Sequence, residues 1–250
     1  MKLLCSAITV SPDITLYHTG PALDHGPLPT LFYFAISGPD SLILDPYNQP
    51  VQFLQGEMVR IFSMTLPAHE GNLAPSDAMG IWAEDFKKKN FLVPFLESVQ
   101  TAIDFAIRER FIDPKHMAVG GLSRGAFIAA HVAARDPRFR FFLGFAPLTH
   151  LKKIQEFQNF PNVPWMEALD LIYLADLLAD RHIRLYIGNH DTRVGTQECF
   201  DFAMALVKKK KQPISQVELI MTPSIGKMGH GTSPEIFKQG AQWILRSVKQ

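Results

Sequence analysis

The sequence is poor in cysteine and has no cluster with the spacing of metal ligands. Its two cysteines, Cys5 and Cys199, lie far apart and form no CxxC pair, so neither a disulfide framework nor a cysteine-based zinc site is expected. No two histidines have the spacing of metal ligands, and no metal is predicted. Low cysteine usage fits a reducing compartment, so the sequence predicts a cytoplasmic location.

The chain also lacks an excess of charge and a long apolar run. Lysine and arginine total 25 against 24 acidic residues, which gives a formal net charge of +1 at pH 7 and no long-range field to attract nucleic acid or an anionic membrane. No stretch of about 18 apolar residues occurs, so no membrane-spanning helix is expected. Polar residues from Ser6 onward interrupt the apolar opening before a secretion signal could form, and the start is interpreted as mature protein.

What the sequence does contain is an alternation of strand-like and helix-like segments. With 250 residues and 47% hydrophobic content, the chain fits one large α/β domain over residues 1–250 better than two small ones. The alternation predicts a mostly parallel central sheet of about eight strands with helices on both faces. Strands are expected at 3–10, 14–18, 31–36, 59–64, 117–121, 141–146, 183–188 and 217–221, and helices at 50–56, 91–111, 124–136, 166–178, 197–209 and 234–248. Loops are expected at 37–40 and, as a long functional connection, at 65–90.

A G-x-S-x-G pentad at residues 121–125 follows a buried strand and leads directly into a helix. This pattern is typical of a sharp turn that holds the serine, Ser123, in a strained backbone conformation, while Gly121 and Gly125 let the strand and the helix approach each other. The N-terminus of the new helix would face any negative charge that forms on a substrate. The pentad predicts a nucleophilic serine, with a glycine-rich turn of no catalytic role as the alternative.

A serine nucleophile needs a base to take its proton and a buried acid to hold that base in one tautomer. In a parallel sheet such groups lie beyond the carboxyl ends of the strands, and Asp191 and His230 each follow a predicted strand there. Asp180 is the alternative acid and His190 the alternative base, although His190 neighbours Asp191 and a triad takes its base from a different loop. The other histidines are interpreted as structural: His18, His25, His69, His116, His131 and His182.

Three motifs occur along the chain in a characteristic order. They are the pentad at 121–125, a G-x-x-D-x-x-V at 188–194 and a Gly-His-Gly at 229–231. In this order they resemble the α/β-hydrolase superfamily, and within it esterases of the prolyl oligopeptidase and dienelactone hydrolase branch, over about residues 30–250. The resemblance implies an α/β-hydrolase fold and a triad without cofactor, in which Ser123 is the nucleophile, Asp191 the acid and His230 the base.

An oxyanion hole in such a fold uses two backbone N–H groups. The first is expected from Arg124, directly after the nucleophile, and the second from the loop after the first central strand. That loop begins Ser37-Gly38-Pro39, without the His-Gly pair that is common in relatives. Since Pro39 has no N–H, Gly38 is predicted as the second donor.

Together these residues predict a serine hydrolase that cleaves small-molecule carboxylic esters through an acyl-enzyme intermediate. The alternatives are a peptidase, amidase or thioesterase of the same fold, and a non-catalytic binding module on the same scaffold. The intact order of the triad residues argues against the binding module, and no segment corresponds to the large N-terminal gating domain of oligopeptidases. Acyl and alcohol preferences depend on the shape of the pocket, which no motif encodes.

Residues 148–164 are predicted to form a small cap over Ser123. The connection that contains them is longer than one covering helix and its loops need, and it emerges on the catalytic side of the sheet. Its aromatic side chains would give an acyl group an apolar wall, with burial in the core as the alternative. The predicted pocket residues are His150, Phe157, Phe160 and Trp165.

Overall fold

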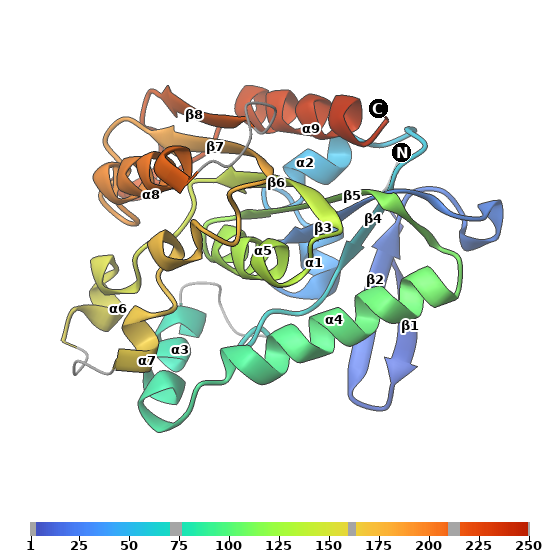
Figure 1. Ribbon diagram of the computed structural model, residues 1–250, viewed down its shortest axis with the longest axis horizontal. Helices are drawn as coiled ribbons and strands as arrows, with labels where there is room; N and C mark the ends of the chain where they lie inside the picture. The colour runs from blue at the N-terminus through green and yellow to red at the C-terminus, as the bar shows by residue number, and fades with distance from the viewer. Residues whose placement is uncertain (1–3, 71–76, 160–163, 210–215, 250) are drawn as a thin grey trace.

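An eight-stranded sheet runs through the protein in the order β1-β2-β4-β3-β5-β6-β7-β8 (Figure 1). The computed structural model describes residues 4–70, 77–159, 164–209 and 216–249. From β4 to β8 every neighbouring pair is parallel, whereas β1–β2 and β2–β4 are antiparallel. The predicted mostly parallel sheet is therefore confirmed. The strands are β1 (Ser6–Ser11), β2 (Ile14–Thr19), β3 (Leu28–Phe34), β4 (Arg60–Ser63), β5 (Ile112–Leu122), β6 (Phe139–Phe145), β7 (His182–Gly188) and β8 (Val217–Thr222).

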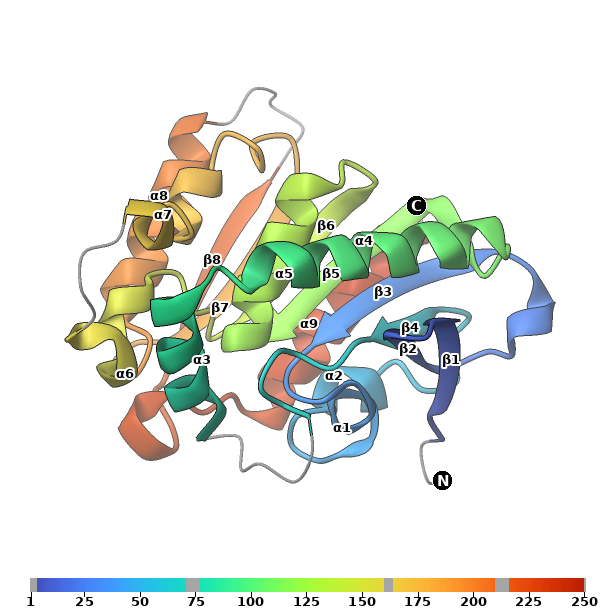
Figure 2. The same ribbon diagram turned by 90° about the horizontal axis from the view of Figure 1, so that it is seen from below.

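Helices cover both faces of this sheet (Figures 1 and 2). One face carries α3 (Asp77–Lys88), α4 (Leu92–Arg108), α5 (Arg124–Arg135) and α8 (Thr196–Lys209), whose apolar residues form the larger core cluster. The other face carries α1 (Gly38–Ile43), α2 (Gln49–Gln52) and α9 (Pro234–Val248), over a second cluster. Short elements complete the described chain: α6 (Gln155–Gln158), α7 (Pro164–Glu167), and the 3-10 turns η1 (Leu23–His25), η2 (Leu151–Lys153), η3 (Leu171–Leu174) and η4 (Lys227–Gly229).

The closing helix α9 shows how the sequence produces this packing. The Ser233 hydroxyl accepts the N–H of Ile236, and proline occupies the first helical position, where its missing N–H costs nothing. Phe237, Ala241 and Ile244 recur at helical spacing and are buried against the sheet. Burying a phenylalanine or isoleucine side chain contributes about 1.5–3 kcal/mol, so this stripe holds the helix in place. The predicted bounds of the helix, 234–248, are confirmed.

Three segments differ from the prediction. The connection at 65–90 contains α3, because the fully buried Trp82 and Phe86 give the segment an apolar face that packs into the larger core. Residues 37–40 begin α1 and are not a loop, since the Ser37 hydroxyl accepts the N–H of Asp40 and caps the helix. A continuous helix at 166–178 is replaced by α7, η3 and turns.

In the described ranges, no helix is long and apolar enough to cross a bilayer.

The predicted helix at 166–178 is interrupted by hydrogen bonds to another segment of the chain. Asp170, within it, accepts the backbone N–H of Leu151 through Oδ1 at 2.8 Å and pairs with His150 through Oδ2 at 2.6 Å. The N–H of Leu171 in turn donates to the carbonyl of Thr149 at 2.9 Å. These bonds to the segment after β6 compete with helical hydrogen bonding and favour short turns.

The direction of the strands decides where the functional groups gather. β5, β7 and β8 run parallel, so their carboxyl ends meet at one edge of the sheet. Ser123 follows the end of β5 and Asp191 follows the end of β7, while His230 lies in the loop after β8. Residues far apart in the sequence are thereby brought to the same edge.

Candidate active site

Ser123 lies in the sharp turn between β5 and α5, with φ 55° and ψ −115°. A positive φ in a residue other than glycine costs on the order of 1–3 kcal/mol and must be held by the surroundings. A Cβ on Gly121 would overlap the backbone of Gly125, and a Cβ on Gly125 would overlap the carbonyl of Phe34. Glycine at both positions lets strand and helix close around the serine, whose N–H donates to the carbonyl of Phe145 at 2.8 Å.

The side chains of Ser123, His230 and Asp191 form one chain of hydrogen bonds. Ser123 Oγ lies 2.8 Å from His230 Nε2, and His230 Nδ1 lies 2.7 Å from Asp191 Oδ2. Because a carboxylate oxygen accepts, Nδ1 carries the ring proton and the lone pair of Nε2 faces the serine hydroxyl. In this geometry the imidazole is oriented to take a proton from Ser123.

Asp191 is held from behind by its own loop. Its Oδ1 accepts the backbone N–H groups of Arg193 at 2.9 Å and Val194 at 3.0 Å. Its backbone N–H donates to Thr196 Oγ1 at 2.9 Å, and the side chain is fully buried. A buried carboxylate needs such donors, and these two leave Oδ2 for the histidine.

The loop that carries His230 is tied to the Asp191 loop. The N–H of Thr192 donates to the carbonyl of Met228 at 2.9 Å, and its hydroxyl donates to the same oxygen at 3.1 Å. Gly229 has φ 70°, and a Cβ there would overlap the carbonyl of His190. The Gly-His-Gly motif therefore fits the loop closely enough to position the ring beside Ser123.

Neither the alternative acid nor the alternative base takes part in the hydrogen-bond chain of Ser123, His230 and Asp191. Asp180 is exposed, pairs with Arg181 and precedes β7, at the opposite edge of the sheet from Ser123. His190 donates its backbone N–H to Ser224 Oγ at 2.6 Å, and its ring has no hydrogen-bond partner in the part of the chain that the structure describes. The structure brings together the predicted trio and neither alternative.

The two predicted oxyanion donors differ in their hydrogen bonding. The N–H of Arg124 is at the start of α5, where the first turn of a helix has no internal acceptor. The N–H of Gly38 instead donates to Thr65 Oγ1 at 3.0 Å within the first turn of α1. The N–H that was predicted as the second donor is therefore already bonded to a side chain, because Gly38 begins a helix that is capped by Ser37.

The turn after β3 offers another backbone N–H group, that of Ser37. The N–H groups of Ala35 and Ile36 both donate to Ser41 Oγ, at 3.2 and 3.0 Å. Among the described residues nothing accepts from the N–H of Ser37. Because the backbone of Gly125 packs on Phe34, the turn that follows β3 lies next to the start of α5.

Arg124 also brings a buried positive charge next to the nucleophile. Its side chain is 6% exposed, its Cζ lies 5.1 Å above the centre of the Trp82 ring, and its guanidinium contacts His69 Nε2 and Met79 Sδ. Burial, followed by the charge of Arg193, lowers the pKa of Arg124 to about 9. Burial and then the Arg124 charge lower the pKa of His69 to about 3, so His69 stays neutral.

An ion pair between Arg193 and Glu156 lies close to the guanidinium of Arg124. Arg193, two residues after Asp191, donates through Nη1 and Nη2 to the carboxylate oxygens of Glu156 at 2.7 and 2.8 Å. This two-pronged contact joins the loop after β7 to α6. Sequence reasoning did not single out Glu156 or Arg193, and it interpreted His69 as structural. Arg193 falls inside the 188–194 motif, whereas nothing around Glu156 or His69 marks them.

The predicted cap segment begins beside the nucleophile, where the N–H of Leu148 donates to the carbonyl of Ser123 at 3.2 Å. Phe157 is fully buried, with its ring centre 5.9 Å from that of Phe86, and Trp165 packs on the same ring at 5.5 Å. These contacts fit the alternative that the aromatic residues belong to the core. Phe160 lies outside the described residues.

The predicted pocket residue His150 is bonded to Asp170 and not to Ser123. Its Nδ1 pairs with Asp170 Oδ2 at 2.6 Å, and this hydrogen bond raises its pKa. The pair links the segment after β6 to the turn before η3. In the described ranges no three His, Cys, Asp or Glu side chains are grouped so that they could hold a metal ion.

A sequence profile described as the prolyl oligopeptidase family matches residues 81–249. This range contains all three motifs and more than half of the chain. The comparison with curated protein sequences gave no match.

Solved structures with the same fold are numerous and distant in sequence. A protein assigned as a dienelactone hydrolase from Klebsiella pneumoniae superposes with a TM-score of 0.71 at 16% identity, over 100% of both chains. A cold-adapted esterase from an Arctic intertidal metagenomic library gives 0.67 at 17% identity, over 97% of this chain and 92% of its own. A puromycin-hydrolysing peptidase of Mycobacterium tuberculosis gives 0.69 at 18% identity, over 98% of this chain. The chain spans 36–39% of the length of the peptidases that it matches, and the neighbours confirm the predicted fold class.

Proposed function

The chain belongs to the prolyl oligopeptidase family of serine hydrolases, and on that premise we propose that it cleaves carboxylic esters through an acyl-enzyme intermediate. The observation that carries the proposal is the hydrogen-bond chain from Ser123 Oγ through the His230 ring to Asp191. A nucleophile, a base in reach of it and an acid that orients the base are the parts that acyl transfer needs.

In the first half of the reaction Ser123 Oγ attacks the ester carbonyl while His230 Nε2 accepts the hydroxyl proton. Asp191 stabilises the resulting imidazolium and keeps the ring in place. The tetrahedral intermediate collapses as Nε2–H protonates the departing alcohol oxygen. The acyl group then remains on Ser123 as an ester. In the second half His230 takes a proton from water, which attacks the acyl carbon, and then returns a proton to Ser123 Oγ.

Negative charge on the carbonyl oxygen requires donors that are in place before the reaction. We assign this role to the N–H of Arg124 and, in place of Gly38, to the N–H of Ser37. Both belong to turns that the close approach of Gly125 and Phe34 brings side by side. Removal of one such donor costs about 10²–10³ in rate in enzymes of this type.

The comparisons support an ester over a peptide as substrate. The esterase and the dienelactone hydrolase are matched over 92% and 100% of their own length, so the fold of this chain corresponds to nearly all of each protein. An amide or peptide is the second candidate, because the matching family is named for oligopeptidases and one neighbour hydrolyses puromycin. The same triad serves both reactions, since His230 can protonate an amine as well as an alcohol.

The test combines active-site labelling with two substrate panels. A fluorophosphonate probe is expected to label the wild-type chain and to leave Ser123→Ala unlabelled. Nitrophenyl esters of graded acyl length are then compared with aminoacyl anilides of matched leaving group. We expect kcat/KM for the best ester to exceed that for the best anilide by about 10² or more, a difference of about 2.7 kcal/mol in transition-state free energy.

Three results would contradict the proposal in different ways. Labelling of Ser123→Ala at the wild-type level would remove Ser123 as nucleophile. Faster turnover of anilides than of esters would make the chain a peptidase or amidase with the same triad. If a folded protein were neither labelled nor active on any substrate, the chain would be a non-catalytic binding module.

A further inference from the structure

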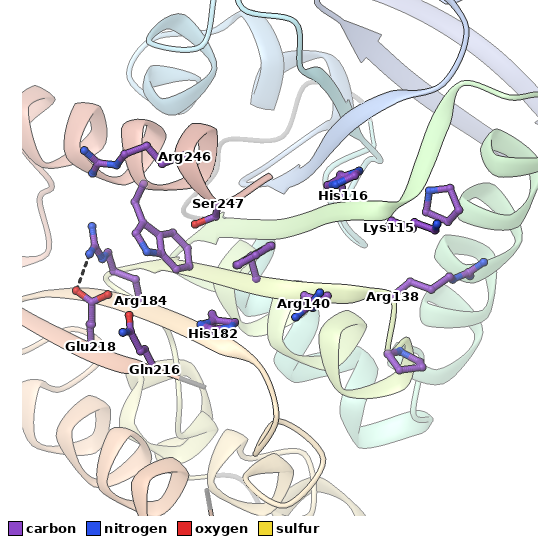
Figure 3. A pocket seen from close by; sticks show the side chains of 14 residues that line it. Lys115, His116, Arg138, Arg140, His182, Arg184, Gln216, Glu218, Arg246 and Ser247 are labelled. Atoms are coloured by element: carbon purple, nitrogen blue, oxygen red, sulfur yellow. Dashed lines mark hydrogen bonds and ion pairs between the residues drawn. The ribbon is translucent and has the colours of Figure 1, made fainter. Parts of the chain in front are cut away.

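A basic cavity lies at the edge of the sheet that is opposite to Ser123 (Figure 3). Its volume is about 930 Å³, and it is lined by the first residues of β6, β7 and β8, the early part of β5 and the last turns of α9. The seven residues of β7 separate this edge from the catalytic edge by about 20 Å. The cavity is therefore separate from the proposed active site.

The charge of the lining is one-sided. Lysine and arginine contribute Lys115, Arg138, Arg140, Arg184 and Arg246, whereas Glu218 is the only carboxylate among the described residues of the lining. This is a local concentration in a chain whose formal net charge is +1. Such clustering in a concave site raises the local concentration of anions.

Two of these cations already have partners. Arg184 Nη2 lies 2.5 Å from Glu218 Oε2, and Arg138 pairs with Asp136 at 2.6 Å and with Asp104 at 2.5 Å. The side chains of Lys115, Arg140 and Arg246 make no hydrogen bond or ion pair with any residue that the structure describes. These three cationic side chains are thus available to bind an anion.

The floor of the cavity is aromatic. The rings of Phe141 and Trp243 meet edge to face with centres 6.2 Å apart, and His182 lies against Phe141 at 5.4 Å. Arg184 Cζ lies 5.2 Å above the Trp243 ring, and its buried Nε has no partner within the described residues. Figure 3 shows Arg140 and His182 next to each other, with Arg184 and Arg246 on the α9 side.

We propose that this cavity binds a phosphorylated small molecule that carries a planar ring, of the size of a nucleoside diphosphate. Separated cations suit the several oxygens of a diphosphate, and arginine in particular presents paired donors to phosphate. The aromatic floor suits a planar ring. The volume falls in the range of small-molecule sites, about 300–1,000 Å³. A hollow of this size favours a small ligand over a nucleic-acid polymer, which is held by an extended basic stripe.

The test is calorimetric titration of the full chain with adenosine diphosphate, and with inorganic pyrophosphate to measure the phosphate contribution alone. Adenosine diphosphate is expected to bind at one site, and pyrophosphate to bind more weakly. Arg140→Ala and Arg246→Ala should each weaken binding by about tenfold, the usual value of one charge-assisted hydrogen bond. Ser123→Ala should bind as the wild type does, since the site lies at the other edge of the sheet.

Lys238→Ala is the matched control. Lys238 is exposed on the same helix as Arg246 but does not line the cavity, so its loss removes the same charge without removing a contact. Equal weakening by Lys238→Ala and Arg246→Ala would reduce the effect to net charge and overturn the proposal. No binding of either probe at millimolar concentration would also overturn it, as would tighter binding of a short single-stranded oligonucleotide that displaces adenosine diphosphate. Arg140 and Arg246 are exposed and make no ion pair with the described residues, so both variants should keep the wild-type melting temperature.

Discussion

The guanidinium of Arg124 lies over the ring of Trp82, 5.1 Å from Cζ to the ring centre, one residue after Ser123. No carboxylate bonds to this buried cation in the described part of the chain, since the nearby Glu156 is occupied by both prongs of Arg193. Its Nε also has no hydrogen-bond partner among the residues that the structure describes. Keeping a charge in such a site costs free energy, which an aromatic face offsets only in part.

We therefore expect Arg124→Met to unfold at the same urea concentration as the wild type or at a higher one. Methionine retains the apolar stem and removes the desolvated charge. The variant keeps the backbone N–H, so kcat/KM for the best ester should fall less than about tenfold. Arg193→Met is the control: it breaks the paired contact with Glu156 and should lose about 1–2 kcal/mol. A larger loss for Arg124→Met than for Arg193→Met would contradict the argument.

Ser123→Ala should abolish ester turnover and keep the wild-type melting temperature or exceed it. The turn geometry is set by Gly121 and Gly125, which the substitution leaves unchanged. The rate should fall by about 10⁴–10⁶. Differential scanning calorimetry and initial rates measure the two effects, and a drop of several degrees would show that the hydroxyl stabilises the fold.

Asp191→Asn should lose ester turnover. The amide that replaces the carboxylate donates a hydrogen bond to His230 Nδ1, so the ring proton moves to Nε2. The histidine is then in the wrong tautomer to accept a proton from Ser123. The expected loss of kcat is about 10⁴. Asp180→Asn, the control acid, should keep most of its activity because Asp180 pairs with Arg181 at the other edge of the sheet. Similar losses in both variants would refute the choice of acid.

The base is tested by the corresponding pair of substitutions. His230→Gln removes the ring that bonds to Ser123, whereas His190→Gln removes a ring that has no bonded partner among the described residues. We expect only the first to lose ester turnover. If the two folded variants were equally inactive, His230 would not be the sole base.

His131 is expected to make stability fall on acidification. It is buried in α5 and donates Nε2–H to the carbonyl of Leu169 at 2.9 Å, and burial lowers its pKa from 6.5 to about 4. Between these values the unfolded chain binds more protons than the folded one, so stability falls as the pH falls below 6.5. At pH 5 this amounts to about 2 kcal/mol. In His131→Gln, which keeps a donor without a titrating ring, the decrease between pH 7 and pH 5 should be smaller by about that amount, as measured by urea unfolding.

Phe157→Ala separates the two interpretations of the segment after β6. Full burial against Phe86 predicts a loss of about 3–5 kcal/mol of stability with an unchanged preference among acyl chain lengths. Phe200→Ala on α8 is the control, because that ring is 42% exposed and its loss should cost far less. A change of chain-length preference of about tenfold without loss of stability would return Phe157 to the wall of a substrate pocket.

The sequence by itself determined the α/β alternation, the closing helix and the three motifs at 121–125, 188–194 and 229–231. These features are local: helical spacing, a serine cap before proline, and glycines that permit a tight turn leave their mark within a few residues. For the same reason the order of the motifs was enough to predict Ser123, Asp191 and His230, whose side chains the structure joins by hydrogen bonds.

Only the tertiary structure decided what each neighbouring group does. The N–H of Gly38 is bonded to Thr65 Oγ1, and the Phe157 ring is buried against Phe86. The helix expected at 166–178 was broken by bonds from Asp170 to the segment after β6. Each outcome depends on a partner from a different part of the chain, and hydrogen bonding and burial are settled between such partners. The sequence pattern of one segment does not indicate which distant residues that segment will contact in the folded protein.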